Sequence, residues 1–244
     1  MKILITGASS GLGEELARRY AKENNELVLL ARREDKLQKL QNELKPFAKS
    51  IELVVVDVSE FETLQEKIKN ISDVDMVILN AGMSIGHSLE ITPFSDFKKL
   101  YDVNLLSNHA ILEVLLPQFK AKKSGKIVFI SSLASLITMP TSVAYSSSKR
   151  ALNAYAEGIR YKYKNHGIKV ITIRPGFIQS EMTDKNSFKM PFLLSNKDGV
   201  NRIYKAIEKE KLIHSFPLRF YLIISLLNSL PQFLRDKIVN SKNK

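Results

Sequence analysis

The chain alternates short apolar runs with longer segments of helical periodicity, and this alternation restricts its fold more than any other feature. Six runs read as strands, at residues 2–6, 26–31, 51–57, 75–80, 126–131 and 169–174. They are almost continuously apolar, as expected when helices cover both faces of a parallel sheet. The pattern predicts an α/β fold with a doubly wound parallel sheet.

Helical stretches separate these runs, and right-handed crossovers place such helices on both faces of the sheet. We expect them at about 12–22, 35–45, 60–70, 95–120 and 143–165, followed by a helix near 197–210 and a short strand near 212–216. The length of 244 residues, 44% of them apolar, suits one α/β domain, and no linker or repeat divides it. We therefore expect a single catalytic domain at 1–215 and a C-terminal extension at 216–244.

The composition excludes several kinds of chemistry. The chain has no cysteine, which rules out disulfides, thiolate metal sites and cysteine nucleophiles and fits a reducing cytoplasm. The four histidines lie far apart in the sequence, so we expect no metal site. The first apolar run is too short for a signal peptide and reads as a buried first strand.

The net charge of +12 is unevenly distributed. The last 44 residues hold nine Lys and Arg against three Asp and Glu, an excess of +6. Such a segment can favour nucleic acid, anionic lipid or an acidic substrate, or form a solvated surface. Because no nucleic-acid-binding module is present, we expect no nucleic acid partner.

A glycine-rich turn, TGASSGLG at 6–13, follows the first predicted strand. Its glycines permit a tight turn and let the backbone approach a pyrophosphate, while the next helix directs its free N–H groups at the anion. The sequence therefore predicts a nucleotide cofactor held by the residues of this turn, namely Gly7, Ser9, Ser10, Gly11, Leu12 and Gly13.

The end of the second strand indicates which cofactor binds. An NAD-preferring site usually carries a carboxylate there for the ribose 2′-hydroxyl, but this chain has Ala31, followed by Arg32 and Arg33. A guanidinium can grip a 2′-phosphate in a bidentate contact, and a serine of the glycine-rich turn can add a hydroxyl. We expect NADP(H) to be preferred over NAD(H).

Polar and small residues also follow the third and fourth strands. Asp57 can accept a hydrogen bond from the adenine amino group, and Val58 can donate its backbone N–H to the ring. The triplet Asn80, Ala81 and Gly82 either lines the ribose or braces the central strands. Both interpretations of the triplet are open.

Three residues near the fifth strand suggest acid–base chemistry. Ser132 follows that strand, Tyr145 lies 13 positions later, and Lys149 lies four beyond the tyrosine. Residues four apart share a helix face, so the lysine ammonium can lower the tyrosine pKa from its ordinary value of about 10. Tyr145 is then the proton donor or acceptor for a carbonyl/alcohol pair, Ser132 stabilises the oxygen, and Lys149 also binds the nicotinamide ribose.

Together these motifs resemble the short-chain dehydrogenase/reductase family, over roughly residues 2–215. The matching positions are 6–13, Asp57-Val58, 80–82, Asn104, Ser132, Tyr145, Lys149 and Pro175-Gly176. The resemblance implies a Rossmann-type sheet of order 3-2-1-4-5-6-7, a nicotinamide cofactor and an Asn–Ser–Tyr–Lys tetrad. It implies that Asn104, otherwise an ordinary mid-helix residue, positions a water in a proton relay to Lys149. Family members commonly form dimers or tetramers through the helices that correspond to 95–120 and 143–165.

The segment after the sixth strand matches the family with small departures. Ile178 would reach the nicotinamide through its backbone N–H, and Ser180 stands where threonine is usual but keeps a hydroxyl for the carboxamide. Leu79 replaces a common asparagine before the triplet. The stretch 179–197, which includes Met190 and Leu193, resembles the mobile loop that covers the substrate. Segments near 83–94, 133–143 and 177–195 would line the pocket with Met83, Leu133, Leu136, Met139, Phe177, Met182 and Phe192, which favours an apolar or amphipathic carbonyl compound.

An uncharged apolar segment lies in the C-terminal extension, at 220–234. With Pro231 inside, it is shorter than the roughly 20 residues of a membrane-spanning helix. It can cover the substrate pocket, form a subunit contact, or rest on anionic lipid at the membrane surface. The principal functional hypothesis is an NADP(H)-dependent oxidoreductase, and the alternative is a redox sensor or scaffold that binds NADP(H) without turnover.

Overall fold

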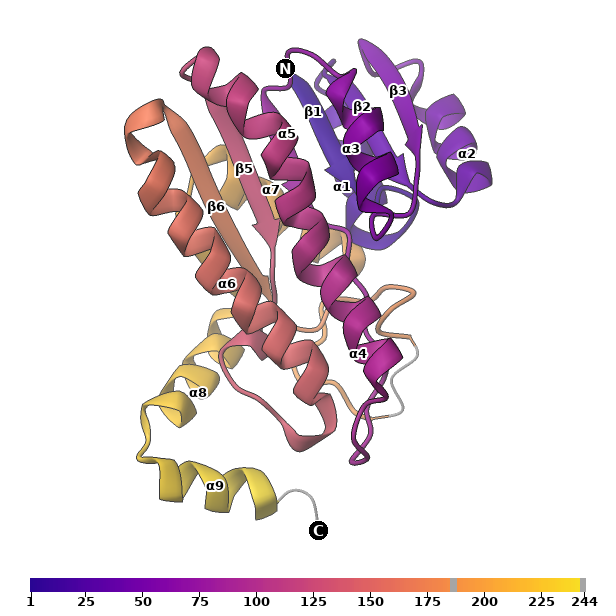
Figure 1. Cartoon of the computed structure of the whole chain (residues 1–244). Coiled ribbons are helices and arrows are strands. Elements are labelled where there is room, and N and C mark those ends of the chain that lie inside the picture. The colour runs from indigo at the N-terminus through magenta and orange to yellow at the C-terminus, as the bar shows by residue number, and fades with distance from the viewer. Residues whose placement is uncertain (185–187, 242–244) are drawn as a thin grey trace.

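The computed structural model describes residues 1–184 and 188–241 and is built on a parallel sheet (Figure 1). Its seven strands are β1 (Lys2–Thr6), β2 (Glu26–Ala31), β3 (Ser50–Val55), β4 (Met76–Leu79), β5 (Gly125–Ile130), β6 (Ile168–Pro175) and β7 (Ile213–Phe216). They lie in the order β3-β2-β1-β4-β5-β6-β7, and every neighbouring pair is parallel. The predicted Rossmann-type sheet and its strand order are therefore confirmed.

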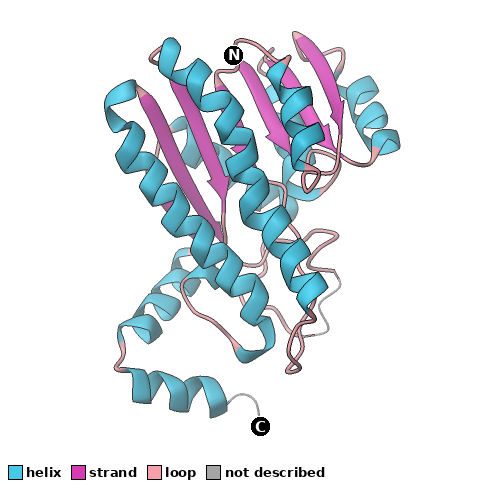
Figure 2. Cartoon of the chain, in the orientation of Figure 1, coloured by secondary structure: helices cyan, strands magenta, loops and turns pink. Residues whose placement is uncertain are grey.

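Helices cover both faces of the sheet, so the molecule has three layers (Figure 2). The helices before β7 are α1 (Gly11–Ala21), α2 (Glu34–Leu44), α3 (Phe61–Lys69), α4 (Phe94–Tyr101), α5 (Ser107–Ala121), α6 (Val143–Tyr163) and α7 (Asn196–Glu208). One core packs α3, α5 and α6 on the sheet around Phe119 and Phe129. The other packs α1, α2 and α7 around Leu16 and Ile203. Apolar strands with two covered faces are what the continuous apolar runs predict.

The predicted helical stretch at 95–120 is present, and it contains a π turn. Between α4 and α5 the chain forms a π-helical turn at Asp102–Leu106, where Asp102, Val103 and Asn104 are all buried. A π turn inserts one extra residue, which shifts the faces of the two flanking helices relative to each other. The predicted helical stretch is therefore confirmed, but the π turn within it was not predicted, because side-chain periodicity does not show a local change of backbone hydrogen bonding.

The C-terminal extension follows β7 as two short helices, α8 (Leu218–Ser229) and α9 (Gln232–Ser241). Figure 1 shows them beyond the carboxyl ends of the strands, with α8 beside the lower end of β6 and α9 farther out. Only Ile224 of α8 is fully buried. Lys242 and Lys244 of the basic segment lie outside the described residues.

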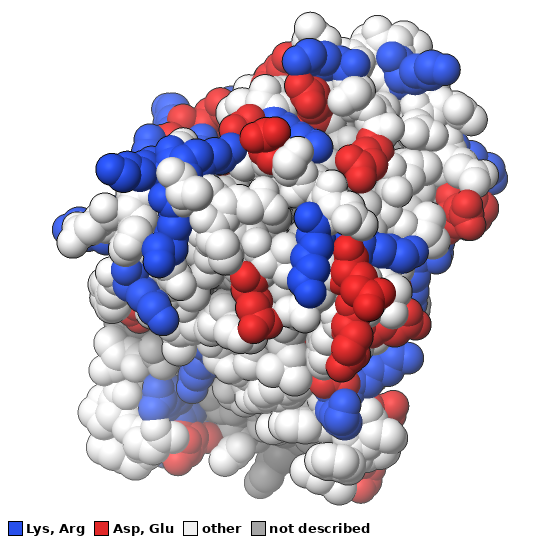
Figure 3. Space-filling view, turned by 45° about the horizontal axis from the view of Figure 1, so that its top comes forward, with Lys and Arg blue, Asp and Glu red and all other residues white. Residues whose placement is uncertain are grey.

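The surface carries charges of both signs. In the view of Figure 3, lysine and arginine side chains alternate with aspartate and glutamate over the exposed face. Within residues 1–184 and 188–241, no helix has both the length and the apolarity to cross a membrane. In the same residues, no group of three or more His, Asp or Glu side chains is placed to hold a metal ion.

Candidate active site

The glycine-rich turn joins β1 to α1 at the point where the strand order reverses, between β1 and β4. Gly7 has a φ of +66°, a conformation that favours glycine. A Cβ on Gly13 would lie 2.4 Å from the carbonyl oxygen of Gly7, so only glycine fits there. The resulting close approach of helix and turn leaves a backbone cradle that suits a pyrophosphate at the start of α1.

Hydrogen bonds between Thr6 and the Asn80 triplet fix the start of the glycine-rich turn. The backbone N–H groups of Asn80 and Ala81 donate to Thr6 Oγ1 over 3.0 and 2.9 Å. The Asn80 side chain donates to the Thr6 carbonyl over 2.9 Å. Of the two interpretations of this triplet, the structure thus shows the bracing of β1 and β4, while ribose contact stays a prediction.

The two arginines after β2 point to different partners. Arg32 lies 3.3 Å from the Asp57 carboxylate, whereas Arg33 donates from Nε to Ser9 Oγ over 3.2 Å and from Nη2 to the Ser9 carbonyl over 3.3 Å. Burial alone would raise the pKa of Asp57, but hydrogen bonds from Ser59 and Arg32 outweigh it and lower the pKa. Arg33 is therefore the arginine that lies against the glycine-rich turn.

Ser132, Tyr145 and Lys149 meet at the carboxyl end of β5. Ser132 caps a short 3-10 turn, accepting the N–H of Ala134 through Oγ over 3.1 Å. Lys149 is 4% exposed and donates from Nζ to the Ile130 carbonyl over 3.0 Å. Its Nζ lies 5.9 Å from the centroid of the Tyr145 ring. Helix α6 thus brings the tyrosine and lysine to the strand end that carries the serine.

The expected lowering of the Tyr145 pKa is not found. Burial raises the pKa of Tyr145, and a hydrogen bond with Ser132 opposes that rise only in part. Burial also lowers the pKa of Lys149 to about 8. Exclusion of water disfavours both charged forms, and the ammonium is directed at a backbone carbonyl rather than at the phenol. Burial therefore favours the neutral phenol of Tyr145 over the phenolate.

Asn104 occupies the middle of the π turn and is completely buried. Its Nδ2 donates to the Met83 carbonyl and to Ser148 Oγ, both over 3.0 Å, and its Oδ1 accepts the Met83 N–H over 2.8 Å. The Asn104 side chain therefore links the segment after β4 to α6. Its partner on α6 is Ser148, the residue before Lys149. Gly82 lies between the side chains of Asn104 and Lys149. A Cβ on Gly82 would lie 3.3 Å from Asn104 Oδ1 and 3.4 Å from Lys149 Nζ.

The segment after β6 returns across the glycine-rich turn. Ile178 forms a parallel bridge with Leu194, whose hydrogen bonds use the backbone of Phe177 and Gln179. The peptide N–H of Ile178 lies outside this bridge. Ser180 and Thr183 close a turn, in which the Ser180 N–H donates to Thr183 Oγ1 over 2.8 Å. Residues 185–187 of the expected covering loop lie outside the described residues.

An aromatic cluster joins two residues of the expected substrate lining to helix α8. Phe177 lies 5.7 Å from Phe188 and 5.9 Å from Phe220, and Phe192 lies 5.6 Å from Phe220, measured between ring centroids. The sequence interpretation placed Phe177 and Phe192 in the lining but left Phe220 open. Close approach of α8 depends on Gly176, because a Cβ there would lie 3.1 Å from the Phe220 ring. Of the other expected lining residues, Leu133 is buried and Met182 is exposed.

Two further charged residues reach the cofactor end and were not expected. Glu181 accepts hydrogen bonds from Arg33 Nη1 over 2.8 Å and from Lys36 Nζ over 2.6 Å. Lys36 lies three residues after Arg33, in the first turn of α2, and this spacing is its only signal in the sequence. Nothing in the local sequence pairs Glu181 with a helix 145 residues away.

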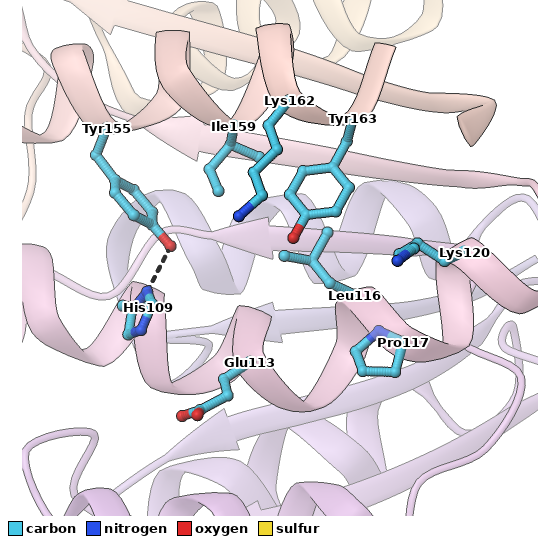
Figure 4. Close-up of a pocket in the computed structure, with 9 residues that line it drawn as sticks. All are labelled: His109, Glu113, Leu116, Pro117, Lys120, Tyr155, Ile159, Lys162 and Tyr163. Atoms are coloured by element: carbon cyan, nitrogen blue, oxygen red, sulfur yellow. Dashed lines mark hydrogen bonds between the residues drawn. The ribbon is translucent and has the colours of Figure 1, made fainter. Parts of the chain in front are cut away.

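A separate groove lies between α5 and α6 (Figure 4). His109 and Tyr155 cross it with a contact of 2.9 Å from Nδ1 to the hydroxyl. Apolar and charged side chains line the rest, namely Glu113, Leu116, Pro117, Lys120, Ile159, Lys162 and Tyr163. It lies on the two helices through which the resemblance implies subunit contacts.

The fold and the site define an oxidoreductase of the nicotinamide-dependent class. The sequence model described as "short chain dehydrogenase" matches residues 1–190. The chain belongs to the short-chain dehydrogenase/reductase family. A protein of Myxococcus xanthus called "Uncharacterized oxidoreductase" is 33% identical over 237 residues, which cover 96% of this chain and 94% of that protein.

Solved structures of the same fold carry different cofactors. A short-chain dehydrogenase from Sphingobium yanoikuyae in complex with NADPH matches with a TM-score of 0.84 and 21% identity, covering 95% of this chain and 96% of that one. A short-chain dehydrogenase/reductase from Burkholderia phymatum in complex with NAD matches with a TM-score of 0.82 and 20% identity, covering 92% of each chain. At these identities the likeness shows the fold alone.

Proposed function

We propose that the protein is an NADP(H)-dependent oxidoreductase that reduces a carbonyl to an alcohol, with Tyr145 as the proton donor. The observation that carries this proposal is the placement of Tyr145, Ser132 and Lys149 together at the carboxyl end of β5. A phenol whose pKa is raised by burial holds its proton at neutral pH, which is the form that carbonyl reduction requires. In the reverse reaction, the same group would have to lose that proton first.

The surrounding residues have separate tasks in this proposal. Ser132 donates a hydrogen bond to the substrate oxygen and stabilises its developing charge. Lys149 keeps two N–H donors beyond the one given to Ile130, and in this proposal they bind the nicotinamide ribose. Asn104 positions Lys149 through Ser148 and the Met83 backbone. When bound, NADPH supplies the hydride.

The residues present fit the phosphorylated cofactor. The backbone cradle at Gly7 and Gly13 accommodates a pyrophosphate that side chains would exclude. Arg33 lies against Ser9 and Lys36 lies beside it, so two cations and a hydroxyl converge where the adenosine ribose is expected. Asp57, Val58, Pro175, Ile178 and Ser180 complete the proposed cofactor contacts.

The proposed mechanism is tested with Tyr145→Phe, which removes the proton donor and keeps the ring. We expect NADPH oxidation over a panel of carbonyl compounds to fall by about a thousandfold in this variant, the scale of an acid–base contribution. Calorimetric binding of NADP⁺ serves as the control and stays within about threefold. Undiminished turnover would remove Tyr145 from the mechanism. Binding without turnover in the native protein would favour the sensor alternative.

The aromatic cluster supports an apolar substrate. Phe177, Phe188, Phe192 and Phe220 form a continuous set of rings on the side of Gly176 that faces α8. Burial of apolar substrate surface against such rings favours binding by about 25 cal/mol per Å². A strong preference for small charged carbonyl compounds would contradict this assignment.

Helix α8 carries a second apolar surface on its outer side. Leu218, Leu222 and Leu226 are spaced by four residues and are 62%, 55% and 66% exposed. Arg219 lies beside this stripe, and Arg235 and Lys237 follow on α9. We propose that the stripe rests on an anionic lipid surface, because the basic residues complement lipid phosphate while two like-charged extensions would repel each other.

The lipid contact is tested in the full chain with Leu222→Glu and Leu226→Glu together. The native protein should co-sediment with vesicles that contain anionic lipid and should stay in solution with neutral vesicles. The double variant should lose this binding but retain its turnover of a soluble carbonyl compound. A different outcome is a native protein that binds neither kind of vesicle and a double variant that dissociates into smaller species. That outcome would identify the stripe as a subunit contact.

We also propose that the protein is a homo-oligomer joined through α5 and α6. The groove of Figure 4 presents Glu113 and the cations Lys120 and Lys162 on one surface, as a self-complementary twofold interface requires. Lys162→Glu should therefore shift the native oligomer toward monomer in sedimentation experiments.

A further inference from the structure

The carboxylate of Glu181 lies on the cations expected to hold the cofactor 2′-phosphate. It is 2.8 Å from Arg33 Nη1 and 2.6 Å from Lys36 Nζ, one oxygen for each cation. The same Arg33 side chain is anchored at Ser9 in the glycine-rich turn. A protein anion thus uses the donors that a bound phosphate would need.

The course of the chain explains how a residue after β6 reaches this place. The bridge between Ile178 and Leu194 fixes the start of the segment, and the turn from Ser180 to Thr183 bends the chain directly after the bridge. Ser180 lies against the glycine-rich turn, since a Cβ on Gly11 would be 3.6 Å from its side chain. Glu181 therefore extends from the segment after β6, past the glycine-rich turn, to Arg33 and Lys36 at the start of α2.

We propose that Glu181 is a specificity-determining residue that competes with the 2′-phosphate of NADP(H) for Arg33 and Lys36. This inference rests on the proposed assignment of Arg33 to that phosphate. Carboxylate and phosphate oxygens accept the same charge-assisted hydrogen bonds. Ser9 already accepts from Arg33 Nε and Nη2, so Glu181 occupies Nη1, the Arg33 nitrogen that is left for a phosphate, together with Lys36 Nζ. NADP(H) must therefore displace Glu181, whereas NAD(H), which has no 2′-phosphate, leaves the pair in place.

NADP(H) binds only the molecules in which Glu181 has left Arg33 and Lys36. The apparent dissociation constant for NADP(H) is therefore the intrinsic constant divided by the fraction of such molecules. The competition also connects the proposed phosphate position to the segment after β6, on which Glu181 lies. Arg33 and Lys36 lower the pKa of Glu181 to about 2 through their hydrogen bonds, so the carboxylate stays ionised across the working pH range. The competition should accordingly respond to salt rather than to pH.

The test compares Glu181→Gln with a matched control, Asp184→Asn. Asp184 is an exposed carboxylate on the same segment, and its substitution changes the net charge by the same amount. Dissociation constants of NADP⁺ and NAD⁺ are measured by calorimetry in the absence of substrate. We expect Glu181→Gln to bind NADP⁺ about three- to tenfold more tightly, the scale of two exposed ion pairs, and NAD⁺ within about twofold of the native protein. Asp184→Asn should change neither constant by more than about twofold.

Weaker or unchanged NADP⁺ binding in Glu181→Gln would overturn the inference, because weaker binding would mean that Glu181 orients Arg33 for the phosphate. An equal gain in Asp184→Asn would also overturn it, since general charge would then explain the effect. The proposed cofactor preference fails separately, if Arg33→Ala leaves NADP⁺ binding unchanged. If Arg33→Ala weakens NADP⁺ binding but Glu181→Gln leaves it unchanged, only the proposed role of Glu181 is overturned.

Discussion

Asn104 donates a hydrogen bond to Ser148 over 3.0 Å, which joins the π turn between α4 and α5 to the helix that carries Tyr145 and Lys149. The contact spans 44 residues of sequence and is fully buried. Together with the two bonds to Met83, it fixes the strand-end segment after β4 relative to α6. Asn104 therefore connects the segment after β4 to the helix that carries Tyr145 and Lys149.

Asn104→Ala should lose both stability and turnover. The substitution leaves the Met83 N–H and carbonyl without their buried partner, and each such group costs about 1–3 kcal/mol. We expect the free energy of unfolding to fall by about 2–4 kcal/mol in urea denaturation, and kcat to fall as the Gly82 segment moves. Asn108→Ala is the control, because it removes one bond to the Asn104 carbonyl and should cost about 1 kcal/mol with kcat retained. Equal losses of stability and kcat in both variants would contradict the connecting role of Asn104.

Gly82→Ala should reduce catalysis without unfolding the protein. The added methyl group would lie 3.3 Å from Asn104 Oδ1 and 3.4 Å from Lys149 Nζ, so one of these groups must shift by a few tenths of an ångström. We expect kcat to fall about tenfold, which corresponds to roughly 1.4 kcal/mol in the barrier. Gly158→Ala on α6 is the matched control, since a Cβ there meets nothing within 4 Å. It should raise stability by about 0.5–1 kcal/mol and leave kcat unchanged.

Lys149 should make the stability of the fold depend on pH above neutrality. Its pKa of about 8 lies below the ordinary lysine value of 10.5, so the unfolded chain binds this proton more tightly. The buried ammonium therefore destabilises the fold fully below pH 8, and the penalty declines between pH 8 and 10.5. Lys149→Met should raise the free energy of unfolding by about 1–3 kcal/mol at pH 7.

This advantage of Lys149→Met should shrink when urea denaturation is repeated at pH 9.5. Lys164→Met is the control, because Lys164 directly follows the same helix, is exposed and does not line the groove between α5 and α6. It should show no such dependence on pH. A difference between native protein and Lys149→Met that stays constant from pH 7 to 9.5 would contradict the lowered pKa.

The two arginines after β2 should differ in their effect on NADP⁺ binding. Arg33 lies against Ser9 and faces the proposed phosphate position, whereas Arg32 is 68% exposed and pairs with Asp57. Loss of a charge-assisted hydrogen bond corresponds to about a 10- to 100-fold increase in the dissociation constant. We expect this increase for Arg33→Ala, less than about threefold for Arg32→Ala, and little change in NAD⁺ binding for either. The measurement is a fluorescence titration of each cofactor, and equal effects of the two variants would contradict the assignment.

Most of the sheet could be predicted from the sequence alone. A parallel strand covered on both faces must be apolar along its whole length, and this property is visible at KILIT and ELVLLA without any tertiary information. The glycine-rich turn is equally local, because the need for glycine at Gly7 and Gly13 arises within one strand–turn–helix unit. The spacing of Tyr145 and Lys149 on one helix face is local as well.

Tertiary structure decided the relationships that depend on which distant segments meet. Side-chain periodicity did not reveal the π turn at Asn104, since backbone hydrogen bonding changed there while the apolar pattern continued. Burial from several elements, which no short window of sequence reports, reversed the expected direction of the Tyr145 pKa. The sequence showed two adjacent arginines, but the fold directed Arg32 to Asp57 and Arg33 to Ser9. It also brought Glu181 and Phe220 into the site, because a contact between segments far apart in the chain is set by packing and leaves no periodic signal.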